Sequence, residues 1–152
     1  LIVISTFALE FIHSDRSIFK IVDLDEAWAF LNVAQGETLS NKLVRAGRAM
    51  NAGVYFVTQS ATDVSKESLK NNIGLKFAFR STAIEEIKQT LEFFGLDKED
   101  ENNQKRLRDL ENGQCLFQDL RGRVGVIQVH PVFEELLTAF DTRPPISRNE
   151  VE

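Results

Sequence analysis

Several features are scarce or missing in this sequence of 152 residues. Its single cysteine, Cys115, rules out an internal disulfide framework and fits a reducing compartment. No apolar run approaches the ~20 residues that span a bilayer, and the opening LIVIS lacks the basic stretch of a signal peptide. The net charge of −5 gives no general attraction for nucleic acid, so any contact with DNA would need a local patch. What remains, 43% apolar and 27% charged residues, is the composition of one globular domain.

A short apolar run ends in two adjacent carboxylates within FKIVDLDEAW, residues 19–28. We expect a buried strand over residues 18–24, which delivers Asp25 and Glu26 at its C-terminal end. In that position the first carboxylate can serve a nucleotide-bound Mg²⁺, and the second can serve the water that attacks the γ-phosphate. The same letters also arise where a strand runs into a solvated helix start, since acids suit the helix dipole there. Both interpretations are open on this motif alone.

A second apolar run follows an amphipathic helix. Over residues 38–51 one stripe is apolar and another face is basic; the stripe is Leu39, Leu43, Ala46 and Met50, and the basic face is Lys42, Arg45 and Arg48. Gly53 is expected to cap this helix, and residues 54–58 (VYFVT) to form a second buried strand that ends at Gln59 and Ser60. Two buried strands joined through helices predict an open, mainly parallel α/β sheet, whose ligand sits beyond the strand ends.

The remaining pattern predicts further elements in order. We expect a helix over residues 1–13, a helix over 27–33 whose Trp28 and Phe30 pack on the core, and a break at residues 35–37. Further on we expect a helical piece over 69–73, a strand over 75–80, a helix over 84–94 that stops at Gly95, and a helix over 104–110. A β-hairpin of residues 114–120 and 123–130, turning at Arg121 and Gly122, and a helix over 132–140 complete the chain.

Phosphoryl hydrolysis needs a metal, an oriented water and positive charge for the transition state. Asp25, Glu26, Gln59 and the arginines Arg45 and Arg48 supply groups for each task. Taken singly, each has a plainer explanation: Gln59 as a capping amide, and the arginines as a solvated helix face. Taken together, the five residues favour a site for phosphoryl hydrolysis over these plainer explanations.

Other reactive side chains lack partners in the sequence. His13 and His130 have no cysteine or carboxylate at metal-ligand spacing, and Ser60 has no arrangement typical of a nucleophile. Cys115, inside an apolar strand, is expected in the core. A P-loop ATPase also needs G-x-x-x-x-G-K-[ST], yet no glycine here is followed by lysine. Because the chain also begins at Leu1 without methionine, we expect it to be part of a larger protein whose phosphate-binding half lies upstream.

The motifs IVDLDEAW, KLVRAGRAMNAG and VYFVTQS, in that order, resemble the C-terminal half of the conjugative-transfer ATPases of type IV secretion systems, relatives of the HerA and FtsK motors. The resemblance extends through NGQCLFQDLRGRVGVIQVHP near the end of the chain. It implies a RecA-like P-loop NTPase core, with residues 1–152 as one domain that lacks the phosphate-binding loop. It also implies ATP hydrolysis with Mg²⁺, although this fragment alone is expected to be inactive.

Carried over by position, the resemblance assigns Asp25 to Mg²⁺, Glu26 as catalytic base, and Gln59 to the water at the γ-phosphate. Arg48, with Arg45 second, is the expected arginine finger that acts on a neighbouring subunit. One departure is Asp23, where such strands usually carry an aliphatic residue. A buried Asp23 would need a partner, unless the strand is more exposed than expected.

The implied partners are further copies of the chain in a hexamer or other ring, and other type IV secretion components. DNA is a candidate substrate. The implied location is the cytoplasmic face of the cell membrane, with membrane association through other parts of the protein. Two alternatives are a DExx-box helicase or other DNA translocase, suggested by Ser60-Ala61-Thr62, and an assembly module that does not hydrolyse ATP. Against the helicase, the arginine element at Arg45 and Arg48 precedes Ser60 instead of following it.

Overall fold

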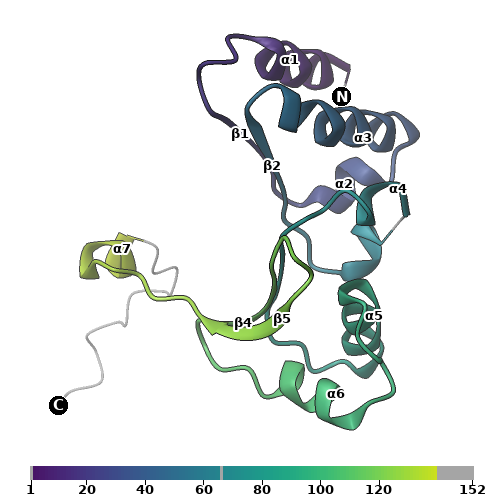
Figure 1. Cartoon of the computed structure of the whole chain (residues 1–152), viewed down its shortest axis with the longest axis vertical. Helices are drawn as coiled ribbons and strands as arrows, with labels where there is room; N and C mark the ends of the chain where they lie inside the picture. The colour runs from purple at the N-terminus through teal and green to yellow at the C-terminus, as the bar shows by residue number, and fades with distance from the viewer. Residues whose placement is uncertain (1, 66, 140–152) are drawn as a thin grey trace, which may run out of the picture.

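The computed structural model describes residues 2–65 and 67–139, in which two small sheets lie beside a layer of helices (Figure 1). The first sheet consists of β1 (Lys20–Leu24) and β2 (Ala52–Phe56). The two strands are parallel, as the sequence predicts, and the register places Leu24 opposite Phe56. Their carboxyl ends therefore meet at one edge of the sheet.

The second sheet is antiparallel. Its strand order is β3 (Lys76–Ala78), β4 (Gln114–Gln118) and β5 (Val124–Gln128). The last two strands form the predicted hairpin, with Gly122 in the left-handed region at the turn. The third strand of the chain thus joins the hairpin, instead of extending the parallel pair.

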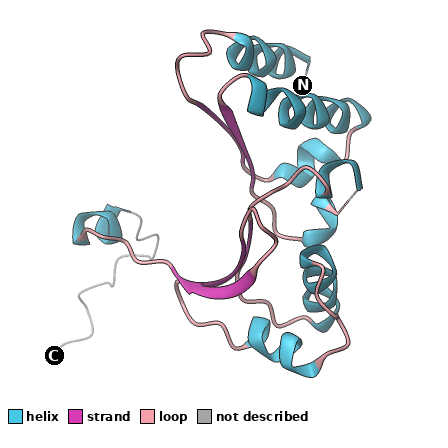
Figure 2. Cartoon of the chain, viewed as in Figure 1, coloured by secondary structure: helices cyan, strands magenta, loops and turns pink. Residues whose placement is uncertain are grey.

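The helices α1 to α6 lie on one side of both sheets (Figure 2). They are α1 (Ile2–His13), α2 (Ala27–Leu31), α3 (Ala34–Ala49), α4 (Glu67–Lys70), α5 (Ile84–Phe94) and α6 (Glu101–Arg108), with a 3₁₀ turn η1 (Ala61–Val64). The last described helix, α7 (Glu134–Ala139), lies apart from them (Figure 1). The end of the predicted last helix and of the predicted domain, residues 140–152, falls outside the described residues, as do residues 1 and 66.

Two apolar clusters hold this layer in place. One joins α1 to α3 through Ile12, Leu39 and Leu43, and Val22 and Val54 of the parallel sheet pack against it. The other is built from α2, α5, α6 and β4, and both sheets contribute to it; it contains Ala27, Leu31, Ile87, Leu91, Leu107 and Leu116, with Leu24, Phe56, Ala78 and Val124 packed on its edge. The predicted apolar stripe of α3 is therefore confirmed.

The opposite face of the parallel sheet is open among the described residues, which corrects the expectation of strands buried on both faces. Ile21 and Tyr55 are about half exposed, and Asp23, opposite Tyr55 in the register, is exposed as well. Asp23 therefore keeps its hydration, and the difficulty of a buried, unpartnered carboxylate does not arise.

The predicted break at residues 35–37 is wrong, because α3 runs through it. The interruption comes earlier, at Val33, whose backbone is extended and whose carbonyl accepts the first amide bonds of the helix. Gly36 has another purpose: a Cβ placed there would lie 1.9 Å from the carbonyl oxygen of Phe30. The glycine lets α3 approach the backbone of α2 closely.

Gly53 does not cap α3, since it lies within β2 opposite Ile21. The left-handed residue after the helix is Asn51, with a φ of 52°. Asparagine tolerates this conformation better than most side chains do, so the chain can turn into β2 without a glycine. By contrast, Gly95 ends α5 in the left-handed region as predicted.

Candidate active site

The parallel register brings the two predicted polar clusters to the same edge of the sheet. Beyond the strands, the amide N–H of Val57 donates to the carbonyl of Leu24 at 3.0 Å, and that of Ala27 donates to the carbonyl of Val57 at 2.8 Å. The side chains meet there as well: Nε2 of Gln59 donates to Oε1 of Glu26 at 2.9 Å. The prediction that these two groups share one edge is confirmed, whereas their catalytic roles stay predictions.

Glu26 has an unusual backbone conformation. Its φ of 51° and ψ of 47° place it in the left-handed region, which costs a non-glycine residue about 1–3 kcal/mol. It occupies the N-cap position of α2, yet its side chain makes no capping hydrogen bond to the helix. The carboxylate is instead directed to Gln59 and Trp28. The strained backbone is therefore consistent with a conformation that serves to place this carboxylate.

Trp28 is the second partner of this carboxylate. Its indole Nε1–H donates to Oε2 of Glu26 at 2.5 Å, while 46% of the residue is exposed. The expectation that Trp28 packs on the core is therefore wrong, although Phe30 does pack against both clusters. Each oxygen of Glu26 accepts one N–H bond, so the carboxylate is fixed in orientation and keeps lone pairs for a further donor.

Asp25 is exposed at the same edge, and its Oδ1 accepts a hydrogen bond from the backbone N–H of Glu26 at 2.9 Å. Within the described part of the chain, no group of three or more His, Cys, Asp or Glu could hold a metal ion by itself. Mg²⁺ does not require such a group, because it commonly binds one or two carboxylates together with water and substrate phosphates. A single accessible carboxylate at Asp25 fits this mode of binding.

Hydrogen bonds restrain the chain on both sides of Gln59. Before Gln59, Oγ1 of Thr58 donates to the carboxylate of Asp63 at 2.5 Å. After it, Oε2 of Glu86 accepts a hydrogen bond from Oγ of Ser60, and Oε1 accepts one from the backbone N–H of Ala61, each at 2.9 Å. Ser60 also caps η1 by accepting a hydrogen bond from the N–H of Thr62. Its contacts therefore stabilise the conformation of the loop.

The end of α3 that carries Arg45 and Arg48 lies away from this group within one chain. The helix runs back toward the start of β2, where a Cβ on Gly47 would lie 2.8 Å from the carbonyl oxygen of Ala52. The whole of β2, about 13 Å, separates that end from the edge with Gln59. Arg45 is exposed and forms no hydrogen bond or ion pair with the described residues. Arg48 lies three residues further on the same helix, and its side chain falls outside the described part.

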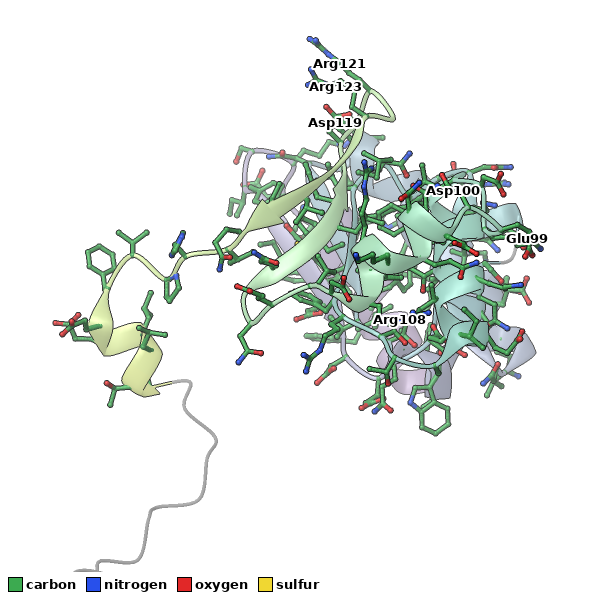
Figure 3. All side chains as sticks on the ribbon, turned by 90° about the horizontal axis from the view of Figure 1, so that it is seen from below. Glu99, Asp100, Arg108, Asp119, Arg121 and Arg123 are labelled. Carbon is green, nitrogen blue, oxygen red and sulfur yellow. The ribbon has the colours of Figure 1, made fainter. Side chains whose placement is uncertain are left out.

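The remaining reactive groups behave as structural ones. Cys115 is fully buried, as predicted, and burial raises the pKa of its thiol. His13 is exposed and its Nδ1 lies 2.7 Å from the carbonyl oxygen of Leu9. At the hairpin turn Asp119 accepts from the backbone N–H groups of Arg121 and Arg123 and pairs with the Arg123 guanidinium at 2.7 Å; Figure 3 shows these three residues at a projecting tip.

Two contributors to the site went unnoticed in the sequence. Trp28 could have been suspected, because an indole N–H two residues after a carboxylate can reach it across the start of a helix. Glu86 offers no such signal, since it lies 26 residues from Ser60 in the chain and only the fold brings the two together.

Comparison with known proteins identifies the family. The profile of the AAA-like domain family matches residues 1–140. The chain belongs to this AAA-like domain family. A curated relative, the uncharacterized protein YddE of Bacillus subtilis (strain 168), is 34% identical over 119 residues; the match covers 78% of this chain and only 14% of YddE.

Solved structures share the fold of this AAA-like domain. VirB4 of Thermoanaerobacter pseudethanolicus superposes with a TM-score of 0.71 at 16% identity, over 88% of this chain and 37% of that one. The genome packaging NTPase B204 of Sulfolobus turreted icosahedral virus 2, solved with ATP-gammaS, superposes with a TM-score of 0.55 at 14% identity. This match covers 73% of this chain and 52% of the B204 chain. The likenesses confirm the predicted α/β core of P-loop NTPase type. No helix in the described part is both long and apolar enough to cross a membrane.

Proposed function

We propose that residues 1–152 form the C-terminal part of an ATPase domain in which Glu26 and Gln59 act on the attacking water. The observation that carries the proposal is the 2.9 Å hydrogen bond between them at the carboxyl edge of two parallel strands. In open α/β sheets that edge is where ligands bind. Membership of the AAA-like domain family and the fold shared with an NTPase solved with ATP-gammaS support the same reaction class.

Each residue has a task set by its chemistry. The Glu26 carboxylate accepts the proton of the water. Hydrogen bonds from Trp28 and Gln59 hold this carboxylate in orientation. The Gln59 amide donates through Nε2, which leaves its carbonyl oxygen to accept from the same water. Asp25 would hold Mg²⁺, which when bound neutralises charge on the phosphates.

The triphosphate itself needs groups that this sequence does not contain. No glycine here is followed by lysine, so the phosphate-binding loop would come from another part of the protein, and the 152 residues alone should bind ATP poorly. Arg48, with Arg45 second, is proposed to act on the nucleotide of a neighbouring subunit. The exposure of Arg45 and its distance from the edge with Gln59 agree with action between subunits.

The biological setting that fits best is a conjugative-transfer or type IV secretion system, in which hydrolysis drives channel assembly and transfer of DNA or protein. The ordered motifs and the fold shared with VirB4 support it. In that setting the protein would form a homo-oligomer, in the simplest case a hexamer, and contact other components of the system. It would act at the cytoplasmic face of the cell membrane, associated with it through other parts of the protein.

The test is Glu26→Gln in a protein that carries this domain together with its phosphate-binding segment. Loss of the base should lower kcat by about 10²- to 10⁴-fold, while nucleotide binding, measured by calorimetry, stays nearly unchanged. Asp23→Asn is the matched control, because Asp23 is an exposed carboxylate on β1, three residues before Glu26, and should leave kcat within about twofold.

Unchanged hydrolysis in Glu26→Gln would remove the proposed base. A protein that binds ATP and never hydrolyses it would support the assembly module instead. Hydrolysis coupled to separation of duplex strands would favour the helicase alternative.

A further inference from the structure

Gln59 is exposed, and it lies in an irregular stretch between β2 and η1. A side chain that must orient a water within a few tenths of an ångström cannot depend on a free loop, since small misplacements of catalytic groups are costly. Bonds to the rest of the described chain lie on both sides of Gln59: before it, the backbone of Val57 bonds to Leu24 and Ala27. After it, Ser60 and Ala61 bond to Glu86.

Glu86 is well suited to hold the loop. It lies in the first turn of α5, three residues after the N-cap Ala83, and the next turn is anchored by the buried residues Ile87, Thr90 and Leu91. A glutamate at this helical position commonly folds back on the N-cap of its own helix. Here both of its oxygens instead accept bonds from the loop, one from Oγ of Ser60 and one from the N–H of Ala61.

The two bonds restrain the loop in complementary ways. The bond to Ala61 fixes the backbone, and the bond to Ser60 fixes the side chain that caps η1. On the other side of Gln59, the bond from Thr58 to Asp63 closes the same loop on itself. The Gln59 backbone is thus held between β2 and α5, with its amide directed at Glu26.

We propose that Glu86 is a positioning residue for Gln59, which couples the packing of α5 to the geometry of the site. The proposal rests on the function proposed above and adds a residue to it. Glu86 touches neither nucleotide nor water in this scheme; it acts through the loop.

The experiment is a double-mutant cycle in the protein that contains this domain and its phosphate-binding segment. Glu86→Gln replaces one acceptor oxygen by an amide NH₂, so one loop donor loses its partner. We expect kcat for ATP hydrolysis to fall about 10- to 100-fold, with KM changed less than threefold. In a Gln59→Ala background the same substitution should have no further effect, because the side chain that it positions is gone.

The matched control is Glu85→Gln, the same change at the neighbouring exposed glutamate, because the described bonds from α5 to the loop come from Glu86. It should leave kcat unchanged. Ser60→Ala serves as a second variant if Glu86→Gln lowers the thermal midpoint markedly. It removes one of the two bonds to Glu86 and leaves Glu86 itself intact. Its smaller loss of kcat should also vanish in the Gln59→Ala background.

The outcomes separate the two proposals. If Gln59→Ala alone leaves kcat unchanged, the proposed function of Gln59 fails, and the role of Glu86 fails with it. If Gln59→Ala slows hydrolysis and Glu86→Gln slows it by the same factor in both backgrounds, the proposed function stands and the positioning role is refuted.

Discussion

The contact between α2 and α3 makes a prediction in which two effects of opposite sign compete. Replacing Gly36 by alanine removes backbone freedom from the unfolded chain and improves helix propensity, which by itself would stabilise α3 by up to ~1 kcal/mol. The new Cβ, however, would lie 1.9 Å from the carbonyl oxygen and 2.8 Å from the carbonyl carbon of Phe30. Both are backbone atoms that no rotamer change can move.

The steric effect should win. Ordinary contact begins near 3.4 Å, so the overlap with the oxygen is about 1.5 Å, and the two helices must separate. Overpacking of this kind costs ~1–3 kcal/mol, and an overlap this large with backbone atoms should lie in the upper half of that range, ~2–3 kcal/mol. Subtracting a gain of ~1 kcal/mol leaves a net loss of about 1–2 kcal/mol. For a chain of this size the thermal midpoint should fall by roughly 2–8 °C. Because Glu26 is the N-cap of α2, the shift should also displace the Glu26 carboxylate from Gln59.

Thermal unfolding followed by circular dichroism is a direct measurement. Gly125→Ala is the control, because a Cβ there meets nothing within 4 Å and the residue has no positive φ. A midpoint for Gly36→Ala that equals or exceeds the unmodified value would show that the helices have room to accept a methyl group, and it would refute the close-approach explanation for this glycine.

Two further predictions concern the arginines and the hairpin. Mixing Arg48→Ala and Glu26→Gln subunits should restore part of the hydrolysis that each lacks alone, because an arginine supplied in trans is typically worth ~10³–10⁵ in turnover. No recovery in verified mixed assemblies would show that Arg48 does not act in trans. Backbone and side-chain hydrogen bonds from Arg123 hold the pKa of Asp119 below its ordinary value, so the turn gains stability above the ordinary aspartate range and loses it as pH falls through the lowered pKa. Protection of the Arg121 and Arg123 amides against exchange, relative to the intrinsic rate at the same pH, should fall in that pH range. Asp119→Asn should abolish this change in protection.

The sequence predicts the parallel pair and the shared edge well, because both follow from local patterns. Apolar runs locate β1 and β2, and chain direction then places Glu26 and Gln59 together. Glycines are harder to interpret, since the same residue permits a turn, a cap or a close approach. In the sequence Gly36 suggests a break, because the group that requires a glycine there, the backbone of Phe30, belongs to another helix. Glu86 was missed for the same reason, as its partners are brought to it only by tertiary packing.

Two residues other than glycine have positive φ in the described part of the chain, and their contrast bears on the site. Asn51, between α3 and β2, is of a type that tolerates the left-handed region, so its conformation needs no special support. Glu26 is not of that type, and its strain must be balanced by its neighbours. Its backbone carbonyl accepts from Ala29, its N–H donates to Asp25, and its side chain accepts from Gln59 and Trp28. A costly conformation that is stabilised by four hydrogen bonds belongs where geometry matters more than stability, which is consistent with Glu26 as the proposed base.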